Sequence, residues 1–103
     1  MIIEYIRYKI AEEERRSELE RAYEKAQAAL VASPHCLSYE LSRCVEESAC
    51  YMLRIEWDST AGHLQGFRTS PEFQEFFTAV RPFLNDIEEM RHYEATSVRR
   101  ERT

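Results

Sequence analysis

The sequence predicts an α+β fold of the ferredoxin-like type, in which an antiparallel four-stranded sheet carries both helices on one face. Three observations predict it. Four segments alternate apolar and polar side chains as strands do, and two repeat apolar residues with the period of a helix. These segments follow one another in the order β-α-β-β-α-β. The 103 residues are 44% hydrophobic and include only two glycines, which fits one domain with a single core.

The first half of the chain begins with a predicted strand over residues 2–10 and continues with a long helix over residues 12–32. Three glutamates fall in the first turn of this helix, where the helix dipole favours negative charge. Pro34 follows its end, since proline cannot continue a helix. The expected apolar strand face is Ile2, Ile6, Tyr8 and Ile10, and the expected helix stripe is Leu19, Ala22, Tyr23, Ala26 and Leu30.

Two further strands, over residues 36–45 and 50–58, are joined by a short polar connector of hairpin length. Side chains on a strand alternate between its two faces, so every second residue belongs to the core side. The expected core-facing residues are Leu37, Tyr39 and Leu41 in the first strand and Tyr51, Leu53, Ile55 and Trp57 in the second.

The last third of the chain is predicted to contain two helices and a strand. Ser59 or Thr60 caps a short helix that carries His63, and Ser70 caps the next, with Pro71 at its first position. A final strand is expected over residues 87–95. We therefore expect one domain over residues 1–96 and a basic tail over residues 97–103. The stripe of the second helix is Phe73, Phe76, Phe77, Val80 and Leu84.

Composition narrows the class of protein. The net charge of −5 argues against nucleic acid as a partner. No segment approaches the roughly 20 apolar residues of a membrane span, so no membrane partner is expected. The N-terminus lacks the features of a signal peptide. The cysteine count is odd, at three, without a metal-like spacing, which favours reduced thiols in a cytoplasmic protein.

One face of the predicted sheet is left without a helix, and its side chains are of mixed character. Two interpretations stay open. The face is simply solvated, or it packs against a second copy of the chain, with Glu40 and Glu56 opposite arginines of that copy. The residues expected on it are Tyr5, Arg7, Glu40, Met52, Arg54, Glu56 and either Met90 or Arg91.

Three segments carry a resemblance to a known family: CLSYELSRC, the strand end IEWDS and the helix start SPEFQEF. Together they resemble the antibiotic-biosynthesis monooxygenase family of small dimeric α+β barrels. The resemblance covers residues 2–96 and implies a homodimer. The family and its relatives include cofactor-free oxygenases, quinol oxidases, haem degraders and many members of unknown role, so the resemblance favours an oxidoreductase but fixes neither the reaction nor that the protein is an enzyme.

Trp57 and His63 are the candidate catalytic residues. Trp57 ends a core-facing strand, where it lines a pocket for a flat aromatic ligand or simply seals the core. His63 follows closely; an imidazole with a pKa near neutrality suits a general base, the alternative being a surface histidine. The candidate substrate-binding residues are Tyr51, Arg54, Phe67, Phe73 and Phe77, the phenylalanine stripe of the second helix being equally consistent with core.

No cofactor or metal is expected. No spacing of His, Asp and Glu resembles a metal site, and two glycines cannot build a phosphate-binding loop. By the resemblance, haem-degrading relatives place a ligand histidine where this chain has Phe77, and phenylalanine cannot bind iron. The family pattern also often places a histidine where this chain has Phe67.

Two functions therefore remain. The first is a cofactor-independent monooxygenase or quinol oxidase that acts on a small electron-rich aromatic, with His63 as the base. The second is a non-catalytic dimeric ligand-binding or stress-associated module on the same fold.

Overall fold

The computed structural model of the chain describes residues 1–102, which form four strands, two α-helices and two short helices of other types. The first strand and helix end close to the predicted boundaries, and the later strands are one or two residues shorter than expected. The elements are β1 (Ile2–Lys9), α1 (Glu13–Ala32), β2 (Cys36–Arg43), β3 (Cys50–Trp57), the π-helix η1 (Gly62–Phe67), α2 (Pro71–Val80), the 3₁₀-helix η2 (Arg81–Asp86) and β4 (Ile87–Glu94).

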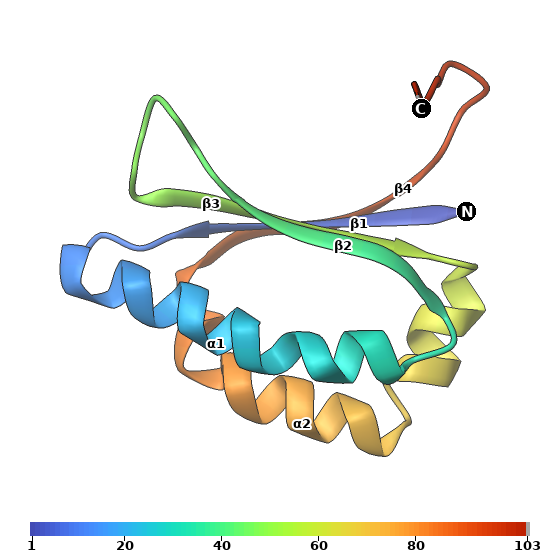
Figure 1. Cartoon of the computed structure of the whole chain (residues 1–103), viewed down its shortest axis with the longest axis horizontal. Coiled ribbons are helices and arrows are strands. Elements are labelled where there is room, and N and C mark those ends of the chain that lie inside the picture. Colours follow the sequence, from blue (N-terminus) through green and yellow to red (C-terminus); the bar gives the residue numbers. More distant parts are fainter. Residues whose placement is uncertain (103) are drawn as a thin grey trace.

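The sheet has the strand order β2-β3-β1-β4, and every neighbouring pair is antiparallel. Both α-helices lie on the same side of it, as Figure 1 shows, and the other side carries no helix. This arrangement confirms the predicted ferredoxin-like α+β fold.

The core lies between the sheet and the two helices. Periodicity places it well: of the stripe predicted for α1, Leu19, Tyr23, Ala26 and Leu30 are buried. A hydrogen bond between the hydroxyls of Tyr8 and Tyr23 joins β1 to α1 inside this core. Burial raises the pKa of Tyr8 to about 12.

Two details of the predicted core are wrong. Leu37 is exposed, because the pairing of β2 with β3 shifts register between Cys36 and Ser38, and the bulge turns the side chain away from the core. In the last helical segment, α2 gives way to the tighter η2 at Arg81, which changes the rotation per residue. Phe83 is therefore buried, whereas Leu84 is exposed.

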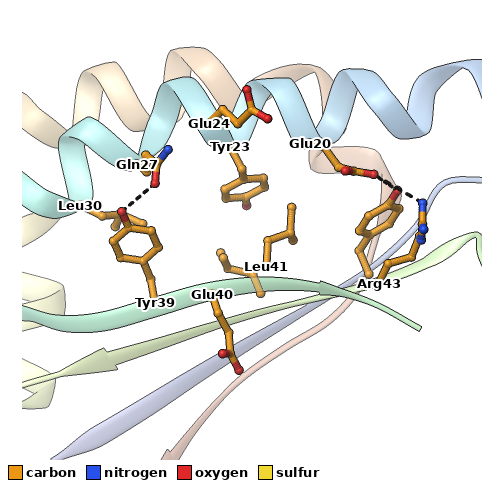
Figure 2. Close-up of a pocket in the computed structure, with 11 residues that line it drawn as sticks. Glu20, Tyr23, Glu24, Gln27, Leu30, Tyr39, Glu40, Leu41 and Arg43 are labelled. Atoms are coloured by element: carbon orange, nitrogen blue, oxygen red, sulfur yellow. Dashed lines mark hydrogen bonds and ion pairs between the residues drawn. The ribbon is translucent and has the colours of Figure 1, made fainter. Parts of the chain in front are cut away.

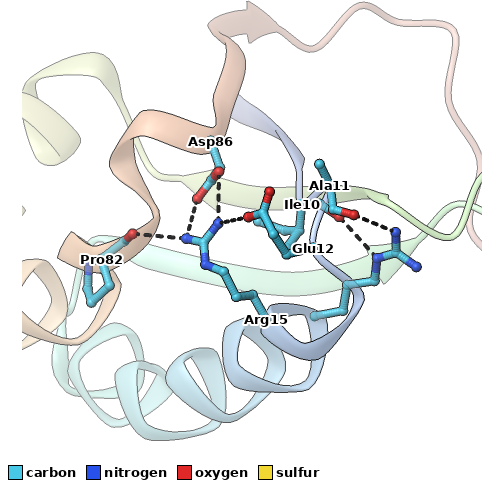
Figure 3. A network of polar contacts seen from close by, with 7 residues as sticks. Ile10, Ala11, Glu12, Arg15, Pro82 and Asp86 are labelled. Atoms are coloured by element: carbon cyan, nitrogen blue, oxygen red, sulfur yellow. Dashed lines mark hydrogen bonds and ion pairs between the residues drawn. The ribbon is translucent and has the colours of Figure 1, made fainter.

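The start of α1 is tied to η2 by Arg15 (Figure 3). Its guanidinium donates to both carboxylate oxygens of Asp86, at 3.2 and 2.7 Å, and to the carbonyl of Pro82 at 3.3 Å. Glu12 accepts another hydrogen bond from it at 2.7 Å. The bidentate pair of Arg15 and Asp86 fixes η2, the segment that leads from α2 into β4.

The uncovered sheet face carries the expected residues, and the register decides one open position. Arg91 pairs with Tyr5 on this face, whereas Met90 pairs with Ile6 on the helix side. Glu56, one of the two glutamates that the dimer interpretation places opposite arginines of a second copy, forms an ion pair with Arg54 of the same chain. The rings of Tyr5 and Tyr93 lie 5.5 Å apart on the same face.

Residues 95–102 form no helix or strand. They belong to the predicted basic tail and the residues just before it, and Thr103, the last residue of that tail, lies outside the described part of the chain. Within residues 1–102, no helix is both long and apolar enough to cross a bilayer.

Candidate functional site

A cavity of about 190 Å³ lies between the helix-covered face of the sheet, η1 and α2. It occupies the place where the sequence suggested a pocket. Five of the candidate site residues line it: Trp57, His63, Phe67, Phe73 and Phe77. Among the other lining residues is Glu4, which was not predicted to belong to the site.

Trp57 forms an aromatic wall of this cavity and is fully buried. Its ring lies 4.5 Å from the ring of His63 and 5.1 Å from that of Phe67. Phe67 in turn meets Phe73 edge to face at 5.6 Å. Phe77 is 37% exposed and lines the cavity at its rim, so of the two interpretations of this side chain the structure favours the cavity edge over the core.

Glu4 brings a carboxylate into this apolar wall, with only 2% of the residue exposed. Trp57 Nε1 donates a hydrogen bond to Glu4 Oε1 at 3.1 Å. The other oxygen, Oε2, lies 3.5 Å from His63 Nε2 and 3.6 Å from His92 Nε2. Burial raises the pKa of Glu4 above its ordinary value, and the hydrogen bond from Trp57 opposes that shift in part.

His63 is buried, with 3% of the residue exposed, so it is not a surface histidine. Neither ring nitrogen has a hydrogen-bond partner within residues 1–102. Burial, helped by the charges of His92 and Arg68, lowers the pKa of His63 to about 4. The expected pKa near neutrality is therefore wrong. At pH 7 the imidazole is neutral, so its 3.5 Å approach to Glu4 is not an ion pair.

The π-helix η1 places His63 and Phe67 together against Trp57. Ser59 Oγ accepts from the backbone N–H of Gly62 at 2.8 Å and caps the segment. The backbone N–H of Arg68 donates to the carbonyl of His63 at 3.1 Å, five residues back, which is the wide π turn. Such turns are frequent at functional sites.

A second polar pair supports η1 from outside. His35 Nδ1 lies 2.9 Å from Asp58 Oδ2, and this pair sits against the two glycines of the segment. A Cβ on Gly62 would lie 1.9 Å from Asp58 Oδ1, and one on Gly66 would lie 2.4 Å from the His35 ring. Both glycines are thus required by the close approach of this pair.

Two candidate substrate-binding residues lie elsewhere in the chain. Arg54 is on the uncovered face of the sheet, paired with Glu56. Tyr51 is on the helix side, but it lines a different and larger cavity of about 350 Å³ between α1 and β2. There Tyr51 donates to Glu20 at 2.7 Å. The single chain therefore does not bring either residue to Trp57 and His63.

The cavity between α1 and β2 is built differently (Figure 2). Tyr39 points from β2 toward α1 and donates to Gln27 at 2.8 Å, while Glu20 lies 3.8 Å from Arg43. The polar side chains that line the cavity between α1 and β2 are thus largely paired with one another. This contrasts with the unpartnered nitrogens of His63.

Fold and cavity together define a ferredoxin-like α+β domain with a buried aromatic site. Residues 1–79 match the model of the family described as antibiotic biosynthesis monooxygenase, and the chain belongs to this family. The uncharacterized protein YczJ of Bacillus subtilis (strain 168) is 30% identical over 77 residues, which are 75% of this chain and 81% of YczJ. The resemblance inferred from the sequence is thereby confirmed.

Solved structures with the same fold agree. The cofactor-independent oxygenase SnoaB from Streptomyces nogalater superimposes with a TM-score of 0.74 at 17% identity, covering 97% of each chain. An antibiotic biosynthesis monooxygenase from Bordetella bronchiseptica, itself of putative function, gives a TM-score of 0.75 at 22% identity, covering 92% of this chain and 96% of the other. At these identities the likeness shows the fold.

Proposed function

We propose that this protein is a cofactor-independent monooxygenase or quinol oxidase that acts on a small electron-rich aromatic in the cavity beside Trp57. The observation that carries the proposal is the buried His63, whose ring nitrogens have no hydrogen-bond partner among residues 1–102 and lie in an aromatic cavity in a member of this family. SnoaB, which shares the fold, is a cofactor-independent oxygenase, and this supports the same reaction class.

The size and lining of the cavity favour a small ligand. At about 190 Å³ it is smaller than the roughly 300–1,000 Å³ that is usual for drug-sized ligands. A quinol of one or two rings fits this space better than a larger polycycle. Trp57 and Phe73 supply ring faces and edges for stacking, and water is largely excluded from such an apolar site.

In the proposed reaction, His63 accepts the proton of the substrate hydroxyl. The resulting electron-rich anion reacts with O₂ directly, so no bound redox group takes part. A quinol and O₂ give a quinone and H₂O₂; an activated ring methylene and O₂ give a carbonyl and water. The protein contributes position, a proton acceptor and a water-poor cavity.

The test is oxygen uptake by the purified protein with simple quinols, compared with the uncatalysed rate. The variant His63→Ala should lower turnover by about 10², the lower end of what a general base contributes, because the lowered pKa of His63 makes it a weak base. Glu18→Gln is the control, because it changes an exposed titratable side chain of α1 outside the cavity, and it should retain turnover. A His63→Ala protein that is folded and fully active would exclude His63 as the base.

A second candidate function is a non-catalytic ligand-binding module on the same fold. Phe67 favours it, because this phenylalanine stands where the family pattern often has a histidine, and it fills the space beside Trp57 with a group that cannot accept a proton. Tight binding of a quinone, together with oxygen uptake no faster than the blank, would establish this function instead.

We also propose that the chain forms a homodimer through the uncovered sheet face. Support comes from the mixed character of that face, where Tyr5, Met52 and Tyr93 lie among charged residues, and from the family. A stable interface of this kind buries about 1,600 Å² in total. Light scattering should give about twice the 12.3 kDa of the chain; a mass of one chain would contradict the proposal.

The proposed location is the cytoplasm. All three cysteines, Cys36, Cys44 and Cys50, are free thiols, which suits a reducing compartment. Fractionation of cells that produce the protein should recover it with the cytoplasmic proteins.

A further inference from the structure

Three potential metal ligands from three separate elements meet at the edge of the cavity: Glu4 of β1, His63 of η1 and His92 of β4. One ligand atom from each lies within 4.8 Å of the others. We propose that Glu4, His63 and His92 form a binding site for a first-row divalent transition metal. The inference goes beyond the proposed function, which needs no metal.

The distances suit one ion held between the three side chains. Glu4 Oε2 lies 3.5 Å from His63 Nε2 and 3.6 Å from His92 Nε2. Metal–ligand bonds of about 2.0–2.2 Å at tetrahedral angles place two ligands of one ion roughly 3.3–3.5 Å apart. The side chains therefore need only small movements to reach a shared ion.

The unmet hydrogen bonding of His63 is the independent observation that points to a ligand. This residue is 3% exposed, and neither of its ring nitrogens has a partner within residues 1–102. A buried polar group without a partner costs about 1–3 kcal/mol, so such groups call for an explanation. An ion on Nε2 supplies the partner that the protein itself does not.

The surroundings orient the carboxylate. Trp57 Nε1 donates to Glu4 Oε1, which leaves Oε2 directed to the two imidazoles. Outer contacts of this kind fix the ligands of many metal sites. Arg68 also lines the cavity, and its positive charge opposes a cation; it is exposed, however, so that water screens the charge.

The donor set decides the class of metal. Two imidazoles and one carboxylate suit Zn²⁺, Fe²⁺, Co²⁺ or Ni²⁺, whereas Mg²⁺ and Ca²⁺ prefer oxygen ligands alone. His92 has about a third of its side chain exposed, at 33%, which gives the ion a path from solvent. An ion on His63 Nε2 would use the lone pair of that nitrogen, so metal and substrate proton compete for it.

The test uses Co²⁺ as a spectroscopic probe and untagged full-length protein, because a polyhistidine tag would itself bind the ion. Adding Co²⁺ to chelator-treated protein should produce visible d–d bands that saturate at one ion per chain. Zn²⁺ should abolish the bands and Mg²⁺ should not. The readout involves no substrate, so it neither requires nor tests the oxygenase activity.

Two variants locate the ion. His92→Ala removes a partly exposed ligand, and Glu4→Gln keeps the shape of the buried side chain; each should weaken Co²⁺ binding by more than the about 10–100-fold that outer contacts cost. Glu18→Gln removes an exposed carboxylate outside the cluster and should bind as the wild type does. Circular dichroism verifies that each variant is folded.

Three results would overturn the proposal. They are the absence of d–d bands with Co²⁺ in excess, bands that persist unchanged in both His92→Ala and Glu4→Gln, and an intense near-ultraviolet charge-transfer band. The last would show thiolate ligation by a cysteine instead.

Discussion

Trp57 and Glu4 are joined inside the protein by a hydrogen bond from the indole Nε1 to the carboxylate Oε1 at 3.1 Å. It connects the end of β3 to β1, and neither residue is more than 2% exposed. The carboxylate of Glu4, which also lines the cavity, thus accepts the hydrogen bond of the buried indole N–H of Trp57. Packing and site chemistry therefore depend on the same contact.

Glu4→Ala should destabilise the protein by about 1–3 kcal/mol, because it leaves the indole N–H buried without an acceptor. Glu4→Gln is the matched variant: its amide oxygen still accepts from Trp57, so the loss should be clearly smaller. Urea unfolding followed by circular dichroism measures both. Equal losses in the two variants would show that the hydrogen bond contributes nothing.

Trp57→Phe should weaken the binding of a small quinone about three- to tenfold, which corresponds to the roughly 0.5–1.5 kcal/mol of an aromatic contact. Isothermal calorimetry makes this measurement. Trp57 is the only tryptophan, so quenching of the wild-type fluorescence by the quinone reports on the same site. An affinity unchanged by the substitution would place the ligand elsewhere.

Gly66→Ala should destabilise the protein by about 1–3 kcal/mol, since the added Cβ would lie 2.4 Å from the His35 ring. Elsewhere, replacing glycine by alanine often stabilises a protein, so a loss here is specific. The same substitution made in a His35→Ala background should cost less. A double-mutant cycle without coupling would contradict the contact.

The pair of His35 and Asp58 predicts a small acid dependence of stability. The hydrogen bond from His35 holds the pKa of Asp58 below its ordinary value of 3.8. The unfolded chain therefore takes up the proton first as the pH falls, so the contribution of the pair is present above about pH 4 and is lost below it.

Thermal unfolding between about pH 5 and about pH 2 tests this dependence. The wild type should lose more of its melting temperature over that range than Asp58→Asn, whose side chain does not titrate. Parallel losses in the two proteins would show that Asp58 does not contribute to the acid dependence.

The spacing of apolar residues and the order of the strands and helices along the chain were enough to predict the fold, because the two periods are rarely ambiguous in this chain. The errors arose where local geometry departs from regular structure. Leu37 was misplaced by a bulge and Phe83 was missed at a 3₁₀ turn, and neither event has a clear signal in the residues around it.

The site was predictable in part. Trp57 and His63 fall close together in sequence, so their meeting could be expected. Glu4 alternates with Ile2 and Ile6 on the apolar face, so the period of the strand already indicates that its carboxylate faces the core. His92 was out of reach, since only the register of β4 against β1 brings it opposite Glu4.

The π-helix has a consequence at the level of the gene. Its i to i+5 hydrogen bond holds one residue more than an α-helical turn, and two buried side chains of the site, His63 and Phe67, stand on it. Deleting a single codon between Gly62 and Phe67 would let the segment close as an ordinary helix and change the angle between these two side chains. Whether this member of the family has a histidine beside its tryptophan thus depends on the length of one turn, and short insertions and deletions can alter the site as decisively as substitutions.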